Sequence, residues 1–383
     1  MARLGGLVEQ IRGVSYKPED LHDGLNDNSV MLLRANNIRN GELNFDDVVY
    51  VDKSKVKAAQ YLRAGDIFIC ASSGSKDLVG KAAYVPSDVP AVFGAFCKVV
   101  RPKVENSQYI GYYFDSPSYR RTISELAAGA NINNIRNEHI DELLIHIPSS
   151  EEQVKITTLL SKLNNIISLR KKQLAKLDEL VKARFVELFA PSELSDETTI
   201  EAVTEQVKVG FVGTCEKYYT DESGVPMLRT GNITEKGICL KDLKYVTREF
   251  HEKNKKSQIH TGDLLIARHG SNGQANVYSG PEAQCLNAVV IVPNQSIASS
   301  IFLAGLINSP MVKEQIERTL VGSTQRVVNT KSIANLKVRV PSTTVQRQYE
   351  EFVKQTDKSK LVIQQSLDKL ETLKKALMQE YFG

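Results

Sequence analysis

The side chains in this chain that could do chemistry are scattered and form no catalytic pattern. Ser72 to Lys76 reads Ser-Ser-Gly-Ser-Lys, which has the look of a phosphate-binding loop but lacks the second glycine and the following helix. There is no G-x-S-x-G elbow. The 6 histidines form no H-x-x-x-H pair, and none lies near a cysteine at metal-ligand spacing. The sequence therefore predicts a binding protein, with no catalytic, cofactor-binding or metal-binding residue of its own.

The bulk composition sets the class of protein. A chain of 383 residues predicts two to three domains, and 42% hydrophobic with 25% charged residues is ordinary for a globular protein. The formal net charge of +4 permits a polyanionic partner without requiring one. The 5 cysteines have no C-x-x-C spacing, which indicates free thiols in a reducing cytosol. No signal core and no membrane-spanning run is visible, so we expect a cytoplasmic protein without a membrane partner.

The sequence elements that would position any site occur twice in the chain. Subtracting 193 pairs residues of the second half with residues of the first, without a gap, at Gly322 and Gly129, Pro341 and Pro148, Gln346 and Gln153, Leu367 and Leu174, Leu370 and Leu177, Leu373 and Leu180, Ala376 and Ala183, and Phe382 and Phe189. A fixed period is the mark of duplicated architecture. We therefore expect two lobes related by a pseudo-twofold internal duplication.

Each copy begins with short strand-like runs separated by turn residues and ends in a long helical pattern. Leu33-Arg34-x-x-Asn37-Ile38 returns as Leu228-Arg229-x-x-Asn232-Ile233, and Gly65-Asp66 returns as Gly262-Asp263. The runs 65–70 and 95–100 are typical of strands, and 106–127 is typical of a helix. The predicted domains are 1–147 and 191–340, each followed by a helical spacer, 148–190 and 341–383. The frames repeat, whereas the loops between them differ in length.

The two long helical patterns, 151–189 and 345–382, predict how the lobes are joined. Apolar residues recur every three or four positions, and neither pattern contains Pro or Gly. Such an apolar stripe must pack on another helix. The link 191–197 spans about 25 Å at most, whereas a helix of 39 residues is about 58 Å long. The chain therefore cannot return along the first helix, so we expect an antiparallel two-helix coiled coil that separates two similar mixed domains, an α+β fold.

Several motifs in their duplicated order give the chain a family resemblance. They are the junction Pro148-x-x-Glu151-Glu152-Gln153-x-x-Ile156, the run Leu174-x-x-Leu177-x-x-Leu180-x-Lys182-Ala183-x-Phe185, and the repeated Leu-Arg-x-x-Asn-Ile and Gly-Asp blocks. Together they resemble the specificity subunit of type I restriction-modification enzymes, over essentially the whole chain. One departure is the second junction, Pro341 to Gln346, which keeps Pro and Gln but lacks the glutamates. This puts the equivalence of the two ends for partner docking in doubt.

The resemblance implies a non-catalytic DNA-binding subunit. Its two domains would be target-recognition domains, each reading one half of an asymmetric bipartite site in double-stranded DNA, with the helices setting the unread spacer. The partners implied are two methyltransferase (modification) subunits, which use S-adenosylmethionine, and nuclease/translocase (restriction) subunits, which use ATP and Mg. No cofactor is expected to bind to this chain itself.

Base reading requires side chains that present hydrogen-bonding groups to a base edge, such as Arg on guanine and Asn or Gln on adenine. In the first domain the candidate DNA-binding residues are Arg34, Asn36, Asn37, Arg39, Ser73, Ser75, Lys76, Asn131, Asn133, Asn134 and Arg136. In the second domain they are Arg229, Thr230, Asn232, Arg268, His269, Ser271, Asn272, Ser323, Thr324, Gln325 and Arg326.

Recurrence in both copies separates these candidates into two classes. Arg34 recurs as Arg229 and Asn37 recurs as Asn232, which favours a framework, turn or phosphate-contact role over base reading. Other candidates, such as Arg268, lie where the copies differ, which favours sequence reading.

Two other interpretations stay open on the sequence alone. One is a stand-alone DNA-binding protein, such as a repressor or architectural protein, which would bind its site without partners. The other is a coiled-coil adaptor without a nucleic-acid partner, whose function would be insensitive to salt. Exposed apolar surface at the ends of the helical rod would favour a partnership with methyltransferase subunits over a protein that acts alone.

Overall fold

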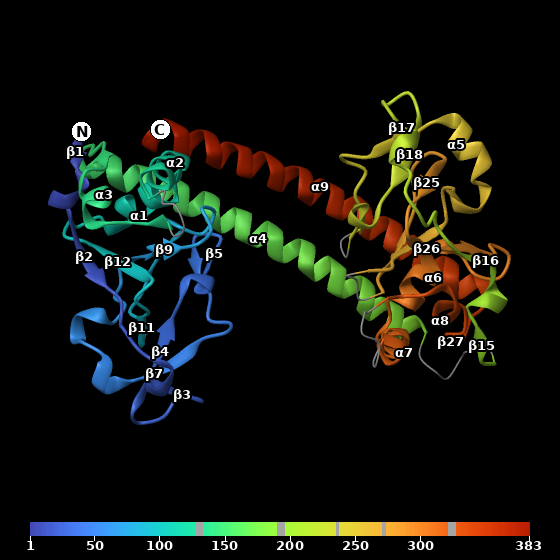
Figure 1. Cartoon of the computed structure of the whole chain (residues 1–383), viewed down its shortest axis with the longest axis horizontal. Helices are drawn as coiled ribbons and strands as arrows, with labels where there is room; N and C mark the ends of the chain where they lie inside the picture. Colours follow the sequence, from blue (N-terminus) through green and yellow to red (C-terminus); the bar gives the residue numbers. More distant parts are fainter. Residues whose placement is uncertain (128–132, 190–195, 235–236, 270–272, 321–326) are drawn as a thin grey trace. The chain divides into compact units, whose positions relative to one another are not determined.

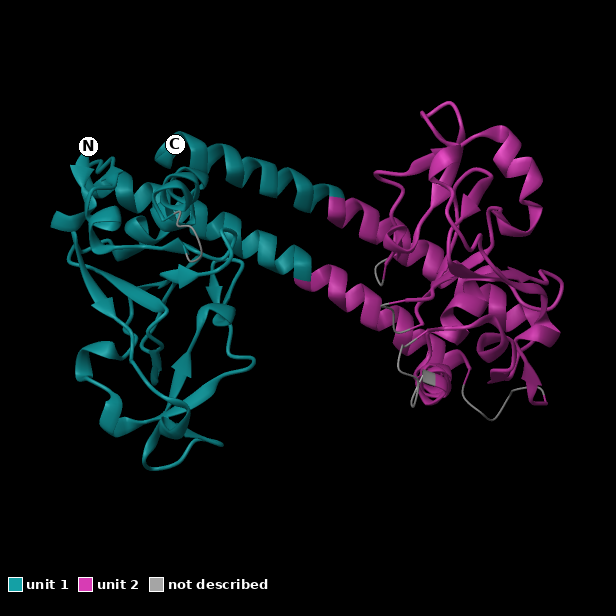
Figure 2. Ribbon diagram, viewed as in Figure 1, with its two compact units in different colours: residues 1–171, 365–383 teal, residues 172–364 magenta. Residues whose placement is uncertain are grey.

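The computed structural model describes residues 1–127, 133–189, 196–234, 237–269, 273–320 and 327–383. The chain divides into two compact units, Met1–Lys171 with Gln365–Gly383 and Lys172–Gln364 (Figure 2). Each unit therefore contains one mixed domain and about half of each long helix. None of the described helices has a stretch long and apolar enough to cross a membrane.

Unit 1 is built on two four-stranded sheets. The first has the order β10-β8-β12-β2 and is antiparallel throughout, with strands β2 (Val8–Arg12), β8 (Ile67–Cys70), β10 (Ala82–Tyr84) and β12 (Cys97–Pro102). The second has the order β11-β4-β7-β3, with strands β3 (Leu21–His22), β4 (Ser29–Leu33), β7 (Val49–Asp52) and β11 (Ala91–Phe93). Three short pairs complete the unit: β1 (Ala2–Arg3) with β14 (Leu144–Ile145), β5 (Ile38–Arg39) with β6 (Glu42–Leu43), and β9 (Ser72–Ser73) with β13 (Asn133–Asn134).

Strand β8 shows how the first sheet is buried on both faces. Successive side chains of a strand point to opposite faces. Ile67 and Ile69 join the core formed with helices α1 (Ser107–Asp115), α2 (Pro117–Leu126) and α3 (Asn137–Asp141), whereas Phe68 and Cys70 join the core formed with the second sheet. The single helix expected over 106–127 is two helices, because Ser116 caps α2 through Tyr119 N and Pro117 begins a new helix.

Unit 2 repeats this plan with local changes. One sheet has the order β16-β26-β23-β24, with strands β16 (Thr204–Val209), β23 (Leu264–Ala267), β24 (Ala275–Val277) and β26 (Ala288–Pro293). The other has the order β17-β21-β18-β25-β22, with strands β17 (Tyr219–Thr220), β18 (Val225–Leu228), β21 (Lys244–Val246), β22 (Gln258–Ile259) and β25 (Ala283–Cys285). Two short strand pairs join β15 (Thr198–Thr199) to β27 (Lys337–Val338) and β19 (Ile233–Thr234) to β20 (Gly237–Ile238). The shorter helices of this unit are α5 (Arg248–Lys253), α6 (Ser300–Ile307), α7 (Pro310–Leu320) and α8 (Thr330–Ala334). The parallel pair of β18 and β25 corresponds to that of β4 and β11, and unit 2 adds the edge strand β22 to this shared arrangement.

The long helices α4 (Ser150–Leu188) and α9 (Thr343–Phe382) begin within two residues of the positions expected (Figure 1). A capping box starts α4: Ser149 Oγ accepts from Glu152 N at 3.3 Å, and Glu152 Oε2 accepts from Ser149 N at 3.1 Å. Gln346 at the start of α9 donates to the carbonyl of Pro341 at 3.0 Å, as Gln153 of α4 donates to that of Pro148 at 3.0 Å, and it also accepts from Ser299 N. The second junction therefore keeps the glutamine contact of the first without its glutamates.

The two long helices run antiparallel within each unit, as the sequence predicts. In unit 1, Leu160 of α4 shares a core with Met378 and Phe382 of α9, and Lys171 pairs with Glu371 at 2.8 Å. In unit 2 the same descending register continues, because Asp178 pairs with Lys360 at 2.7 Å and Phe185 contacts Tyr349 with ring centroids 5.3 Å apart. The apolar stripes thus bury against each other and against the domain of their own unit.

Each domain core is closed by the end of a long helix. Phe382 of α9 packs on Tyr109 of α1, with ring centroids 5.0 Å apart, in unit 1. In unit 2, Phe189 packs on Phe302 of α6, also at 5.0 Å. Phe302 follows Tyr109 by 193 residues, and Phe382 follows Phe189 by the same 193 residues. The duplication therefore extends to the docking of helix ends on the domains.

Candidate nucleic-acid interface

The recurring asparagine of each copy organises a turn. In unit 1 Asn37 is fully buried, and its Nδ2 donates to the carbonyls of Asn44 at 2.9 Å and Asp46 at 3.0 Å. Its Oδ1 accepts from Arg34 N at 2.8 Å. All of the hydrogen-bonding groups of this amide are engaged within the domain. Asn37 therefore holds a loop in shape and has no group left to offer a base.

Unit 2 repeats this turn around Asn232, whose Oδ1 accepts from Arg229 N at 3.0 Å. The paired arginines also act on their own loops: Arg34 Nη2 donates to the Asp47 carbonyl at 3.2 Å, and Arg229 Nη2 donates to the Asp242 carbonyl at 3.3 Å. These contacts agree with the framework role that recurrence suggested. A DNA contact by the exposed edges of the two arginines stays a prediction.

The other candidates of this first loop lie nearer the surface. Asn36 Nδ2 donates to Asp47 Oδ2 at 2.8 Å, and Arg39 Nη1 approaches Asp46 Oδ2 at 3.3 Å with its side chain 54% exposed. Thr230 begins the corresponding turn of unit 2 and is half-buried. In unit 1, Asn36 and Arg39 would have to break their contacts with these carboxylates before they could bind DNA.

The structure brings two of the predicted loops of unit 1 together. Strand β9 pairs with β13, which sets Asn133 opposite Ser73 and Asn134 opposite Ser72. Asn133 is buried, and its Nδ2 donates to the Ser73 carbonyl at 3.3 Å, whereas Asn134 is exposed. Loops separated by 60 residues thus form one edge. Ser75, Lys76 and Arg136 are exposed beside it, and Asn131 lies outside the described residues.

Unit 2 has an equivalent edge. His269 and Val327 form an antiparallel bridge, and Val328 N donates to the Arg268 carbonyl at 3.0 Å. The guanidinium of Arg268 donates to the Val328 carbonyl at 3.3 Å and to Asn287 Oδ1 at 3.0 Å. Arg268 therefore links the two segments of this edge. The difference between the copies at this position had favoured base reading and did not indicate this structural role. Ser271, Asn272, Ser323, Thr324, Gln325 and Arg326 lie outside the described residues.

A buried lysine that the sequence reasoning missed supports the edge of unit 1. Lys98 is 8% exposed, and its Nζ donates to Gln10 Oε1 at 2.9 Å, to Asn137 Oδ1 at 2.7 Å and to the Ile135 carbonyl at 3.5 Å. Burial lowers the pKa of this ammonium group. Lys98 thus anchors the segment that follows β13. An isolated lysine inside an apolar strand was the signal available in the sequence.

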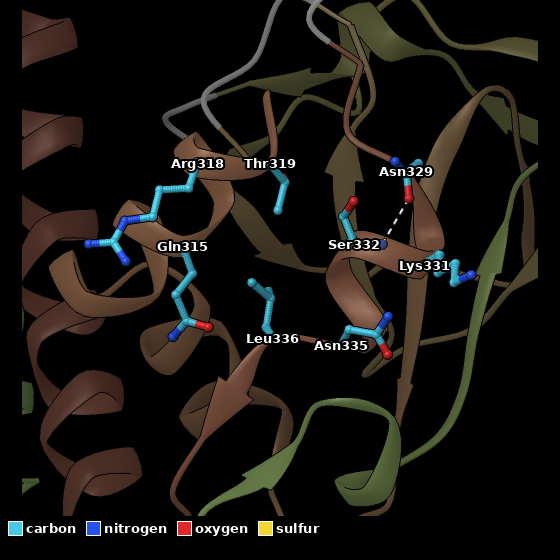
Figure 3. Close-up of a pocket in the computed structure, with 8 residues that line it drawn as sticks. All are labelled: Gln315, Arg318, Thr319, Asn329, Lys331, Ser332, Asn335 and Leu336. Atoms are coloured by element: carbon cyan, nitrogen blue, oxygen red, sulfur yellow. Dashed lines mark hydrogen bonds between the residues drawn. The ribbon is translucent and has the colours of Figure 1, made fainter. Parts of the chain in front are cut away.

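A hollow of about 470 Å³ in unit 2 offers no better site. It lies between α7 and α8 (Figure 3), and Arg318 extends away from it to pair with Glu314 one turn earlier. Gln315 is engaged with the backbone of Lys337, both donating and accepting at 2.9 Å. Among the described residues there is also no cluster of three His, Cys, Asp or Glu side chains that could hold a metal ion.

Comparison with known proteins agrees with this architecture. The family model described as type I restriction modification DNA specificity domain matches residues 2–179 and again 200–372. The chain is 33% identical over 291 residues to the type I restriction enzyme EcoKI specificity subunit of Escherichia coli (strain K12), which covers 71% of this chain and 61% of that relative. It is 32% identical over 290 residues to the StySPI specificity subunit of Salmonella potsdam, which covers 72% and 62%. The matched part thus spans about three fifths of the length of these relatives.

Solved structures share the fold over the whole chain. The S subunit of the type I restriction-modification system from M. genitalium superposes with a TM-score of 0.59 at 15% identity, covering 100% of this chain and 95% of that one. A chain from a structural study of complex assembly in the type I R-M system superposes with a TM-score of 0.55, also at 15% identity, covering 100% and 96%. With both halves matched in sequence, the chain belongs to the family of type I restriction-modification DNA specificity domains and carries that domain twice.

Proposed function

We propose that this chain is the DNA-recognition subunit of a type I restriction-modification complex, in which each domain reads one half of a bipartite site in double-stranded DNA. One observation carries the proposal. In each unit, two loops about 60 residues apart in sequence meet as a strand pair or bridge, β9 with β13 and His269 with Val327, on a frame that both units share. A shared frame with different edge residues is what two readers of different sequences require.

The framework contacts support an asymmetric target. The turns around Asn37 and Asn232 are built alike, whereas Ser72 on one edge corresponds to His269 on the other. Because hydroxyl and imidazole groups offer different patterns to a base edge, the two half-sites should differ in sequence. The target is then non-palindromic.

The long helices would act as the spacer between the half-sites. Half-sites on one face of a duplex lie about 34 Å apart, or a multiple of that distance. α4 has 39 residues and α9 has 40, so each is about 58 to 60 Å long, enough to hold two readers at such a separation. The ion pairs of Lys171 with Glu371 and Lys360 with Asp178 agree with one antiparallel register of the helix pair within each unit.

The surface of the long helices supports docking of partner subunits. Both helices keep large apolar side chains exposed although they are already paired: Val154, Leu159, Ile166, Leu169, Leu180, Val186, Leu361, Val362 and Leu373 are each 42–65% exposed. So many large apolar side chains left exposed on paired helices favour a surface that a partner covers over a protein that works alone. We therefore infer that two methyltransferase subunits dock there and supply S-adenosylmethionine chemistry, and that restriction subunits using ATP and Mg join for cleavage. This chain would carry no catalytic residue and would act in the cytoplasm.

The test is to sequence methylated adenines in cells with and without the gene. We expect one bipartite motif to disappear with the gene. Replacing residues 1–147 by those of a relative should change one half of the motif only, and inserting four residues into α4 should change the spacer only. Loss of both halves after the domain replacement would contradict the assignment.

Purified components separate the alternatives. We expect the chain alone to neither methylate nor cleave DNA, and to gain specific binding when methyltransferase subunits are added. Binding of one bipartite site without partners would favour a stand-alone repressor or architectural protein. Binding that falls steeply with salt is expected, because phosphate contacts release counterions. A function unaffected by salt would favour a coiled-coil adaptor.

A further inference from the structure

Phe96 is a large apolar side chain that unit 1 leaves 73% exposed. Single exposed apolar residues are common on proteins, so exposure alone assigns nothing. The position of Phe96 is what gives it meaning. It lies in the turn between β11 and β12, which the hydrogen bond from Cys97 N to the Gly94 carbonyl closes at 2.8 Å. The backbone that presents Phe96 is therefore fixed.

This turn is joined directly to the candidate reading edge of unit 1. The carbonyl of Phe96 accepts from Ala71 N at 2.9 Å and from Ser72 N at 3.0 Å. Ser72 belongs to β9, which pairs with β13 and so lies across from the exposed Asn134. Three segments far apart in sequence, those of Phe96, Ser72 and Asn134, thus meet at one edge. Phe96 is an apolar residue of this otherwise polar edge.

Strand register identifies the counterpart of Phe96 in unit 2. Cys97 pairs with Cys70 in unit 1 as Ala288 pairs with Ala267 in unit 2, so Phe96 and Asn287 each come directly before the equivalent strand. The turn that they end has three residues in unit 1, 94–96, and two in unit 2, 286–287. Asn287 has a positive φ of 52° and accepts from the Arg268 guanidinium at 3.0 Å. In unit 2 this position serves the frame. In unit 1 it holds an aromatic side chain that the frame does not use.

We propose that Phe96 is a specificity-determining residue that contacts the C5-methyl group of a thymine in the half-site of the first domain. The proposal rests on the proposed function. The thymine methyl is the apolar group on the base edges of the major groove, and Phe is one of the side chains that recognise it. The neighbouring amide of Asn134 suits adenine, which also pairs with thymine. The half-site of the first domain therefore contains an A·T pair whose thymine methyl is read by Phe96.

The experiment uses the full chain assembled with its methyltransferase subunits, on a duplex that carries the bipartite motif found by methylation sequencing. Each thymine of the first half-site is replaced in turn by uracil, which removes only the methyl group. We expect one replacement to weaken binding about fourfold, the equivalent of one buried methyl group of about 0.8 kcal/mol. In Phe96→Ala the same replacement should have no effect, and Phe96→Leu should restore part of it.

Leu25→Ala is the matched control, because Leu25 is 69% exposed in the loop between β3 and β4, and β3 lies at the opposite edge of its sheet from β11. It should leave the preference for thymine over uracil unchanged. The proposal is overturned if the first half-site holds no thymine on either strand, or if Phe96→Ala keeps the wild-type preference. It is also overturned if 2-aminopurine fluorescence shows Phe96 inserted between bases. A wild-type complex without any sequence preference would instead refute the proposed function itself.

Discussion

The Gly-Asp motif occurs in both units, as Gly65-Asp66 and Gly262-Asp263. The two buried aspartates have different partners, and this difference can be tested by mutation. Asp66 is fully buried and binds Arg101 through two contacts, Nε to Oδ1 at 2.7 Å and Nη2 to Oδ2 at 2.8 Å. Asp263 is also buried, at 5% exposed, but register places Val292 where unit 1 has Arg101. Its Oδ2 accepts from His260 N at 2.9 Å, and burial raises the pKa of Asp263.

Asp66→Asn keeps the shape of the side chain and removes the charge that faces Arg101. Leaving one partner of a buried ion pair alone costs about 3 to 5 kcal/mol. Arg101 still donates to the carbonyl of Tyr61 at 3.1 Å and is 17% exposed, so we expect the lower end of that range. Asp263→Asn leaves an oxygen to accept from His260 N and removes a desolvated charge. It should change the free energy of unfolding of unit 2 by less than about 1 kcal/mol.

Hydrogen exchange measured by mass spectrometry separates the two units in one sample. Asp66→Asn should speed exchange in β8 and leave β23 unchanged, whereas Asp263→Asn should alter neither strongly. A cost for Asp66→Asn below about 1 kcal/mol, or equal costs for the two variants, would refute the reasoning from the ion pair.

The pH dependence of unit 2 gives a second readout of Asp263. Because the folded pKa is raised, the native state binds the proton more tightly than the unfolded chain does. The contribution of Asp263 to stability is therefore largest below the unfolded pKa of 3.8, falls as the pH rises through the raised folded pKa, and is constant above it. Asp263→Asn should remove this component, and persistence of the same slope would assign it to another group.

Three further predictions probe other contacts. Phe382→Ala should destabilise unit 1 by about 3 kcal/mol through a cavity in its aromatic core, with faster exchange in α1; exchange confined to the end of α9 would contradict this. Lys98→Met should speed exchange in β13, whereas Lys208→Met, which removes a lysine bound to the Gln258 carbonyl, should not. Burial lowers the pKa of both lysines, so the unfolded chain binds the proton more tightly than the folded protein. The free energy of unfolding should therefore rise with pH between the lowered folded pKa and 10.5, and each Met variant should lose the rise that its lysine causes. Gln346→Ala should cost about 1 to 3 kcal/mol and fray the start of α9, as measured by urea unfolding and exchange; a neutral result would make its hydrogen bonds incidental.

Patterns of short range predicted much of the fold. The step of three and four between apolar residues placed α4 and α9 to within two residues, because a helix of about 40 residues repeats that signal many times. The offset of 193 paired Phe382 with Phe189 but did not reveal that each packs on an aromatic residue of a domain core. Recurrence favoured a turn role for Asn37 and Asn232, and each side chain accepts a backbone hydrogen bond within such a turn.

Contacts between distant segments could not be predicted in the same way. The run 95–100 reads as a strand, but β12 begins at Cys97, because a turn closed on Gly94 precedes it. Phe96 was therefore read as a strand residue instead of an exposed one. Lys98 is buried, and Gln10 and Asn137, which satisfy its ammonium group, come from other parts of the chain. The pairing of β9 with β13 likewise depends on tertiary structure, as such a short strand carries no periodicity of its own.

The closure of the first core by residues 365–383 has a consequence for synthesis on the ribosome. The surface around Tyr109 and Tyr113 emerges early but finds Met378 and Phe382 only after the whole of unit 2 has been translated. During that interval the nascent first domain carries an uncovered aromatic patch, which a chaperone or a neighbouring nascent chain could bind. A premature stop codon near the 3′ end of the gene would then disable the domain that was made first and leave the later one folded.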